Sequence, residues 1–397
     1  MAEETKPLQK KNPFITLQAK CFLTDSGENF FTKKQIPLRD MIGPDGRKRY
    51  GFTTLNFHAY LVQKLIVKRM ISDIFVAKPT LLEKRTEIMD VTKLVIYGIL
   101  YKKFGPQLSK VLVSTELMEK YNKKNPTKKI TLNSKFNYDA ISKLIEIKKE
   151  EIIGLKKLML ARPISMIDTD QEIRPEDKLE KKLIVTKFVE MIDKQSWYMF
   201  YLISQTDERQ AIIKHVEKQL IDYLEKTKIA DYFALMLMEI IQNAEKAHLE
   251  KIARQKNMLK PTDSIDSFLR DKGCRDMVVV QAKKWDHNLN LFWRFENPNI
   301  ALEDEEYKLQ VQVVNKGVVG QKKKKSMQNK IKAEVKESSL ANFYEHGGAE
   351  KLGAGLGLFY LSYIDEACKN FNIKFESRII TDEKKEETIV HMGLKFV

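Results

Sequence analysis

The stretch "KLGAGLGLFYLS", residues 351–362, holds glycines at alternate positions and then becomes an apolar run. The glycines are Gly353, Gly355 and Gly357, and such residues let the backbone adopt unusual conformations and let a partner approach it closely. The apolar run predicts a helix over 356–369, whose first N–H groups have no partner within the helix. A glycine-rich turn that leads into a helix can bind phosphate, although a tight structural turn uses the same residues.

The composition of the chain excludes several classes of protein. Its 397 residues are 43% hydrophobic and 31% charged, as in a globular chain long enough for two or more domains. A formal charge of +16 makes acidic partners such as nucleotides favourable. The lysine clusters at 123–129 and 322–325 contain no aromatic residue, so we expect solvated loops there and no nucleic-acid partner.

The cysteines and the N-terminus indicate where the protein works. Cys21, Cys274 and Cys368 are far apart and none belongs to a CxxC pair, which argues against a disulfide framework or a zinc site. The leader "MAEETKPLQKKNPF" lacks the apolar core of a signal peptide, and no stretch reaches the roughly 18 apolar residues of a membrane span. We therefore expect a cytoplasmic protein without a membrane span.

The pattern of apolar residues predicts an α+β fold. Amphipathic helices are expected over 204–226 and 229–254, and the apolar runs "MVVVQA" and "LNLFWRF" that follow suit an antiparallel hairpin. A strand "YKLQVQVV", the helix after the glycines, and a closing pair "IKFESRII" and "TIVHMGLKF" complete the pattern. Together they predict a C-terminal α/β sandwich, a mixed sheet with helices on one face.

Changes in composition divide the chain into three expected segments. Residues 1–178 form an N-terminal, mainly helical α+β region, 179–214 a helical connector or dimerisation segment, and 215–397 the C-terminal sandwich. Two prolines and several acids in 162–178 indicate a linker or exposed loop, and 102–106 looks like a break between helices. No internal repeat is present in the sequence.

The second C-terminal helix brings three chemically useful side chains together. Glu239, Asn243 and Lys246 are spaced at four and three residues, so they share one face of a helix. An amide oxygen can coordinate Mg²⁺, an ammonium can bind a phosphate, and a carboxylate can take a proton. Many solvated helices show the same spacing, but here the preceding residues are apolar enough to place the acid at the edge of a core.

Taken together, the two elements resemble those of the GHKL (Bergerat-fold) ATPases, and most closely the ATP-binding domain of sensor histidine kinases. The sequence "MEIIQNAEKA" (238–247) is similar to that family's N box. The sequence "ANFYEHGGAEKLGAGLGLFYLSYI" (341–364) is similar to its lid and G2 box. The resemblance covers roughly residues 215–397 and follows the family's order of elements.

The resemblance implies a set of site residues for ATP and Mg²⁺. Asn243 would hold the metal, Lys246 would contact phosphate, and Glu239 would occupy the place of the general base in the ATPase members. The residues around the triphosphate would be those of the glycine stretch: Gly353, Gly355, Leu356 and Gly357.

The turn that binds adenine departs from the family pattern. After "LNLFWRF" the family has a D-x-G-x-G turn whose aspartate binds the adenine amino group, whereas this chain reads "ENPNI" over 296–300. Asn297 is the nearest counterpart of that aspartate. An asparagine can still accept a hydrogen bond, but it is neutral, and Pro298 stiffens the turn.

Two functions are consistent with the resemblance. The first is a Mg-ATP-binding, histidine-kinase-like signalling protein that phosphorylates a partner, since none of the six histidines is followed by the acid that marks the family's phosphoacceptor. Such a protein would be a histidine-type protein kinase or an ATPase. The second is an inactive pseudo-kinase whose fold serves as a protein-interaction module. Either form would work with a protein partner or as a homodimer.

Overall fold

The computed structural model describes residues 13–396 apart from 44, 132–133, 135–137, 261, 285–286, 297–306 and 317–363. The chain forms two compact units. Unit 1 combines Met1–Ile96 with Ile229–Val397, and unit 2 is Tyr97–Lys228. The N-terminal residues thus share a unit with the C-terminal ones, a division that differs from the three consecutive segments expected from composition.

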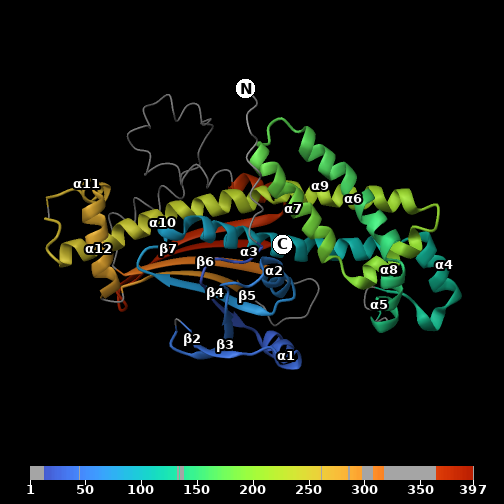
Figure 1. Ribbon diagram of the computed structural model, residues 1–397, viewed down its shortest axis with the longest axis horizontal. Coiled ribbons are helices and arrows are strands. Elements are labelled where there is room, and N and C mark those ends of the chain that lie inside the picture. The colour runs from blue at the N-terminus through green and yellow to red at the C-terminus, as the bar shows by residue number, and fades with distance from the viewer. Residues whose placement is uncertain are drawn as a thin grey trace, which may run out of the picture. The chain divides into compact units, whose positions relative to one another are not determined.

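Unit 1 is built on one eight-stranded sheet in the order β2-β3-β1-β4-β5-β6-β8-β7 (Figure 1). The two halves of the sheet come from the two ends of the chain and join where β4 pairs with β5, for example at Phe75 opposite Phe292. The strands are β1 (Lys20–Leu23), β2 (Arg39–Ile42), β3 (Lys48–Thr53), β4 (Ile71–Lys78), β5 (Leu289–Glu296), β6 (Tyr307–Lys316), β7 (Ile373–Asp382) and β8 (Glu387–Phe396).

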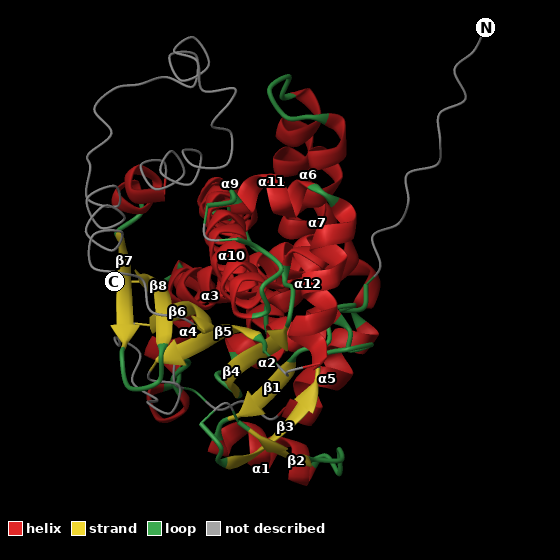
Figure 2. Ribbon diagram, turned by 90° about the vertical axis from the view of Figure 1, so that its left-hand side faces the viewer, coloured by secondary structure: helices red, strands yellow, loops and turns green. Residues whose placement is uncertain are grey.

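The helices of unit 1 include two long ones, α3 and α10, that lie side by side along one face of the sheet (Figures 1 and 2). An ion pair of 2.6 Å between Lys93 and Asp231 joins these two helices. None of the described helices is long and apolar enough to cross a membrane. The helices are α1 (Asp25–Lys33), α2 (Ala59–Val67), η1 (Leu82–Lys84), α3 (Arg85–Val113, which continues into unit 2), α10 (Lys228–Gln255), α11 (Ile265–Arg270) and α12 (Lys272–Lys284).

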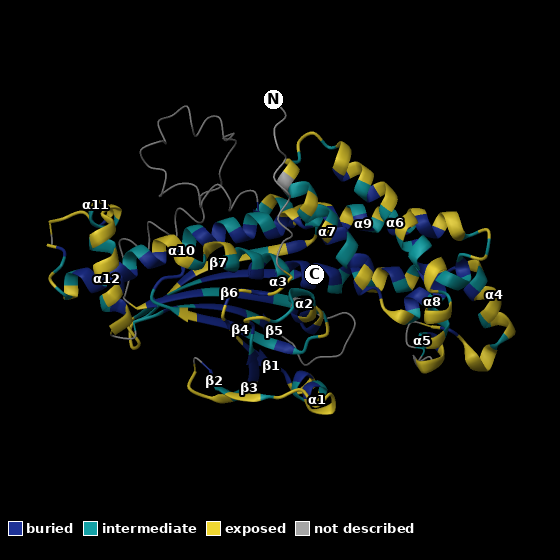
Figure 3. Ribbon diagram, in the orientation of Figure 1, coloured by how far each residue is buried: buried dark blue, intermediate teal, exposed yellow. Residues whose placement is uncertain are grey.

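The helix α10 is amphipathic, and this property fixes how it lies on the sheet. Its buried residues recur every three or four positions and include Phe233, Leu237 and Ile241, so one flank faces the core. Figure 3 shows buried and intermediate residues alternating along this helix. The sheet contributes Trp293, which is fully buried and donates an indole hydrogen bond of 3.1 Å to Thr92 of α3. This bond satisfies the indole N–H in the core.

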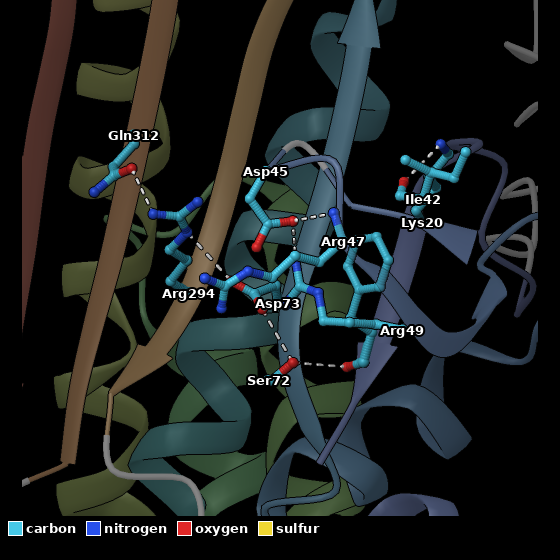
Figure 4. Close-up of polar contacts among 10 residues, drawn as sticks. Lys20, Ile42, Asp45, Arg47, Arg49, Ser72, Asp73, Arg294 and Gln312 are labelled. Atoms are coloured by element: carbon cyan, nitrogen blue, oxygen red, sulfur yellow. Dashed lines mark hydrogen bonds and ion pairs between the residues drawn. The ribbon is translucent and has the colours of Figure 1, made fainter. Parts of the chain in front are cut away.

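The opposite face of the sheet carries a polar cluster around Asp73 of β4 (Figure 4). Arg49 of β3 extends over the ring of Phe22 in β1, 4.2 Å from its centroid, and donates a 2.7 Å bond to the carboxylate of Asp73. Arg294 of β5 pairs with the same carboxylate at 3.2 Å, and Ser72 donates to it at 3.0 Å. The cluster therefore connects strands on both sides of the junction between β4 and β5.

Helices are the only regular secondary structure among the described residues of unit 2. Its core includes an aromatic cluster in which the ring centroid of Phe188 lies 5.0 Å from that of Tyr101 and 4.7 Å from that of Tyr223. The Tyr223 hydroxyl donates a 2.9 Å bond to the carbonyl of Tyr97. Besides the second part of α3, the helices are α4 (Glu116–Lys124), η2 (Pro126–Lys128), α5 (Tyr138–Ile147), α6 (Lys149–Thr169), α7 (Pro175–Met191), α8 (Lys194–Ile203) and α9 (Arg209–Lys226).

The α+β class predicted from the sequence is confirmed, with two corrections to its details. All described neighbouring strands are antiparallel, so the expected mixed sheet is wrong in its strand directions. The run "MVVVQA" is part of helix α12 and not a strand, and β5 forms its hairpin with β6 instead. Val278, Val279 and Ala282 are buried against the end of α10, a helical spacing that the β-branched residues obscured.

The prolines also misled the sequence reading of unit 2. Pro106 lies inside α3 and Pro163 inside α6, so neither the expected break at 102–106 nor most of the expected linker at 162–178 exists. Only the short segment 170–174 connects α6 with α7. Packing within unit 2 stabilises both helices enough to accommodate a residue that isolated helices disfavour.

Replacing Asp73 tests whether the polar cluster stabilises the sheet junction. We expect Asp73→Ala to lower the free energy of unfolding by about 1–3 kcal/mol, because two guanidinium groups lose their shared carboxylate. Glu146→Ala, which removes an exposed carboxylate from a loose pair with Lys149, should change it by no more than about 0.5 kcal/mol. Urea denaturation of both variants measures the difference, and equal effects would contradict this role.

Candidate functional site

The structure places the three side chains predicted from the helix pattern along α10. Asn243 is exposed, whereas Glu239 and Lys246 are half-buried. All three lie outside the stripe that packs on the core, so the helix does not require them for folding. Polar groups presented in this way are available to a ligand, and the expected grouping of the three on one helix is found.

Glu239 has a perturbed protonation equilibrium. Burial raises the pKa of its carboxyl above the ordinary value, and the nearby Arg85 guanidinium acts in the opposite direction. Because Arg85 is the first residue of α3, this interaction places the start of that helix beside the middle of α10. A carboxylate whose pKa is perturbed by burial and by a neighbouring arginine is a candidate for a functional role in proton transfer.

Lys246 forms an ion pair with an acidic side chain of a neighbouring helix. Its ammonium lies 2.5 Å from the carboxylate of Asp266 in α11, and both groups are partly exposed. An exposed pair of this kind contributes little stability. A phosphate at this position would therefore compete with Asp266 at modest cost.

The remaining residues implied by the resemblance lie outside the described part of the chain. They are Asn297, Gly353, Gly355, Leu356 and Gly357. The structure therefore neither supports nor contradicts their proposed roles.

Asn315 and Thr388 form a pair of buried polar residues that sequence reasoning missed. They stand directly opposite each other on β6 and β8 and are only 5% and 2% exposed. Alternation from the buried Val313 places Asn315 on the helix-covered face of the sheet. An ion pair of 3.5 Å between Lys251 and Glu386 brings the second half of α10 to the β7–β8 turn, close to Thr388.

This pair changes the interpretation of the adenine-binding turn. The resemblance implies that this turn follows β5, but β5 and β6 form a hairpin before the chain reaches the glycine stretch. The strand that ends before the long segment is therefore β6, and "NKG" at 315–317 follows its apolar residues. The signal that could have found it is this Asn-x-Gly at the end of a strand.

Glu245 is the most deeply buried acid on α10 and was also missed. It is 2% exposed and accepts hydrogen bonds of 2.8 and 3.0 Å from the backbone N–H groups of Leu81 and Leu82. Arg275 of α12 lies 3.4 Å away. Burial is the largest influence on Glu245 and raises its pKa, while the hydrogen bonds oppose that change. The contacts show that Glu245 anchors α10 to the segment before α3 and to α12.

His248 follows one turn later and is almost fully buried. Burial lowers the pKa of its imidazole to about 4, and its Nε2 atom has no hydrogen-bond partner among the described residues. The ring of His287 lies 6.4 Å away, centroid to centroid. Among the described residues no group of three His, Cys, Asp or Glu side chains is placed to hold a metal. Because burial lowers its pKa, His248 is neutral in the core at physiological pH.

The buried imidazole predicts a loss of stability in acid. Because the folded state keeps His248 neutral below its ordinary pKa of 6.5, the unfolded chain binds more protons between about pH 6.5 and 4. As the pH is lowered through that window, the free energy of unfolding should decrease by about 3 kcal/mol because of this residue. His248→Leu should flatten the pH dependence of the free energy of unfolding there, as followed by denaturation at several pH values. An unchanged slope would contradict the assignment.

Comparison with known proteins gives a family without an assigned function. A family described as "Family of unknown function (DUF8084)" matches residues 10–396. The chain is also similar to an uncharacterized protein of Treponema pallidum (strain Nichols), with 24% identity over 386 residues that cover 97% of this chain and 99% of that protein. No solved structure shows significant similarity to the chain.

Proposed function

The chain belongs to the DUF8084 family, and we propose that it is a cytoplasmic, Mg-ATP-binding, histidine-kinase-like signalling protein. The single observation that carries the proposal is the polar flank of α10. This flank presents Asn243 to solvent and holds Glu239 half-buried with a raised pKa, while the opposite flank packs in the core. The order of helix, hairpin and closing hairpin around it supports the same assignment.

The residues of the flank suit the phosphate end of the nucleotide. The exposed amide oxygen of Asn243 is a hard donor of the kind Mg²⁺ prefers, and this ion commonly takes few protein ligands together with phosphate oxygens. When bound, the ion supplies charge neutralisation on the phosphates. Lys246 contacts a phosphate after leaving Asp266, and Glu239 accepts a proton from the attacking group. The glycine stretch surrounds the triphosphate by resemblance.

Asn315 and Thr388 suit the base end of the nucleotide. A buried amide and a buried hydroxyl offer both donors and acceptors at the end of the sheet nearest the second half of α10. An amide can accept from the adenine amino group and donate to a ring nitrogen. We therefore assign the base contact to Asn315 in place of Asn297.

Removing the amide of Asn243 tests nucleotide binding. We expect Asn243→Ala to weaken Mg²⁺-dependent binding of a non-hydrolysable ATP analogue at least roughly tenfold, because the metal loses its protein ligand. Gln242→Ala changes the exposed neighbour and should retain the wild-type affinity. Isothermal titration with and without Mg²⁺ measures both variants, and equal binding by the two would count against the site.

Replacing Asn315 by aspartate, the residue that binds adenine in the GHKL ATPases that the chain resembles, tests the base contact. A carboxylate only accepts hydrogen bonds, so Asn315→Asp should favour the adenine amino group and disfavour the guanine carbonyl. The ratio of ATP to GTP affinity is expected to increase roughly tenfold or more. Competition between the two nucleotides measures this ratio, with Asn290→Asp as control, because it makes the same change on the opposite face of the sheet. An unchanged ratio places the base elsewhere.

A catalytically inactive interaction module is the second candidate. The observation that favours it is the ion pair between Lys246 and Asp266, which occupies the ammonium that a phosphate would need. A specific ligand must stabilise the folded state, so the unfolding temperature with ATP, ADP and GTP separates the candidates. No shift with any of them at millimolar concentration favours the interaction module.

A further inference from the structure

The two edges of the sheet differ in a way that points to an interaction surface. The edge strand β2 has four residues, which is short enough to offer little to an incoming strand. The edge strand β7 has ten residues and pairs with β8 along its whole length without a bulge. No described strand pairs with the outer side of β7. A long, regular and proline-free edge is a template for strand addition unless something protects it.

The side chains of β7 are complementary to a second copy of the same strand. When two copies pair antiparallel about a twofold axis at Ser377, Glu376 of each copy lies opposite Arg378 of the other. The axis therefore creates two equivalent pairs of opposite charge. Both side chains are exposed on the helix-free face. Opposite charges at directly opposed positions stabilise an antiparallel pair.

The same arrangement also matches the apolar side of the strand. Phe375 of each copy would lie opposite Ile379 of the other, on the face where Phe375 already packs against Phe233 of α10. Aromatic and β-branched residues are favourable cross-strand partners. A twofold axis normal to the sheet keeps the helix-covered face continuous from one copy to the next, because opposed residues share a face.

Charge selects this register over its neighbours. Moving the axis to Arg378 places that arginine opposite itself. Moving it to Glu376 places two carboxylates together and Lys374 opposite Arg378. Like charges in direct opposition are destabilising, so the register centred on Ser377 is the favoured one. Within its own chain Glu376 also lies 3.4 Å from Lys308, an exposed contact that pairing can retain.

We propose that the β7 edge is a homodimer interface in which two copies of this chain join their sheets antiparallel about Ser377. This interface is separate from the nucleotide site on α10 and does not depend on it. The dimer forms a continuous sheet across both molecules and protects an edge that no described strand of the monomer covers.

Charge reversal on the full-length chain tests the proposal. Arg378→Glu or Glu376→Arg alone places like charges in both cross-strand pairs and should raise the dimer dissociation constant roughly tenfold or more. The double variant E376R/R378E restores both pairs and should return the constant close to the wild-type value. Lys374→Glu reverses a charge on the same strand opposite Ile380 and serves as the control, with little change expected. Sedimentation equilibrium over a range of concentrations measures all four.

A cysteine at the axis gives an independent readout of register. In a Cys274→Ser background, which removes the one native cysteine that is not buried, Ser377→Cys should form an intermolecular disulfide on mild oxidation. Thr381→Cys lies on the same face of β7 but opposite Ile373, so it should cross-link far less. A monomeric wild-type chain, a single charge reversal without effect, or equal cross-linking at both positions would overturn the proposal.

Discussion

The packing of α10 against the antiparallel sheet is the constraint on which the rest of unit 1 depends. One flank of this helix joins the core, and Glu245 fixes its position through the N–H groups of Leu81 and Leu82. The sheet beneath it needs both ends of the chain, joined between β4 and β5. Because core packing determines the rotation of α10, it also determines that Asn243 is exposed and that Glu239 lies at the boundary of the core.

Polar side chains have different roles on the two faces of the sheet. On the open face, Asp73 joins Arg49 to Arg294 and thereby links strands that are distant in sequence. On the helix-covered face, the uncharged pair of Asn315 and Thr388 is buried where β6 lies opposite β8. The amide of Asn315 and the hydroxyl of Thr388 each carry a hydrogen-bond donor and an acceptor, which are the groups used to recognise a nucleotide base.

The sequence was most informative where periodicity and side-chain chemistry agreed. The spacing of apolar residues in α10 predicted both the helix and its polar flank, including Glu239 and Asn243. It failed for α12, where a run of β-branched residues imitates a strand, and for Pro106 and Pro163, which tertiary packing accommodates within helices. The pairing of the first four strands with the last four could not be read from local patterns, because it depends on contacts between distant residues. Asn315 and Glu245 were missed for the same reason, because their burial depends on residues that are distant in the sequence.

The proposed nucleotide site extends from the polar flank of α10 to the ends of β6 and β8. Hydrogen–deuterium exchange of the full chain, with and without a Mg²⁺-bound ATP analogue, tests it most directly. We expect added protection in α10 around Asn243 and at the ends of β6 and β8 near Asn315 and Thr388, with unit 2 unchanged. Protection confined to unit 2, or no change anywhere under conditions where the analogue is bound, would contradict it.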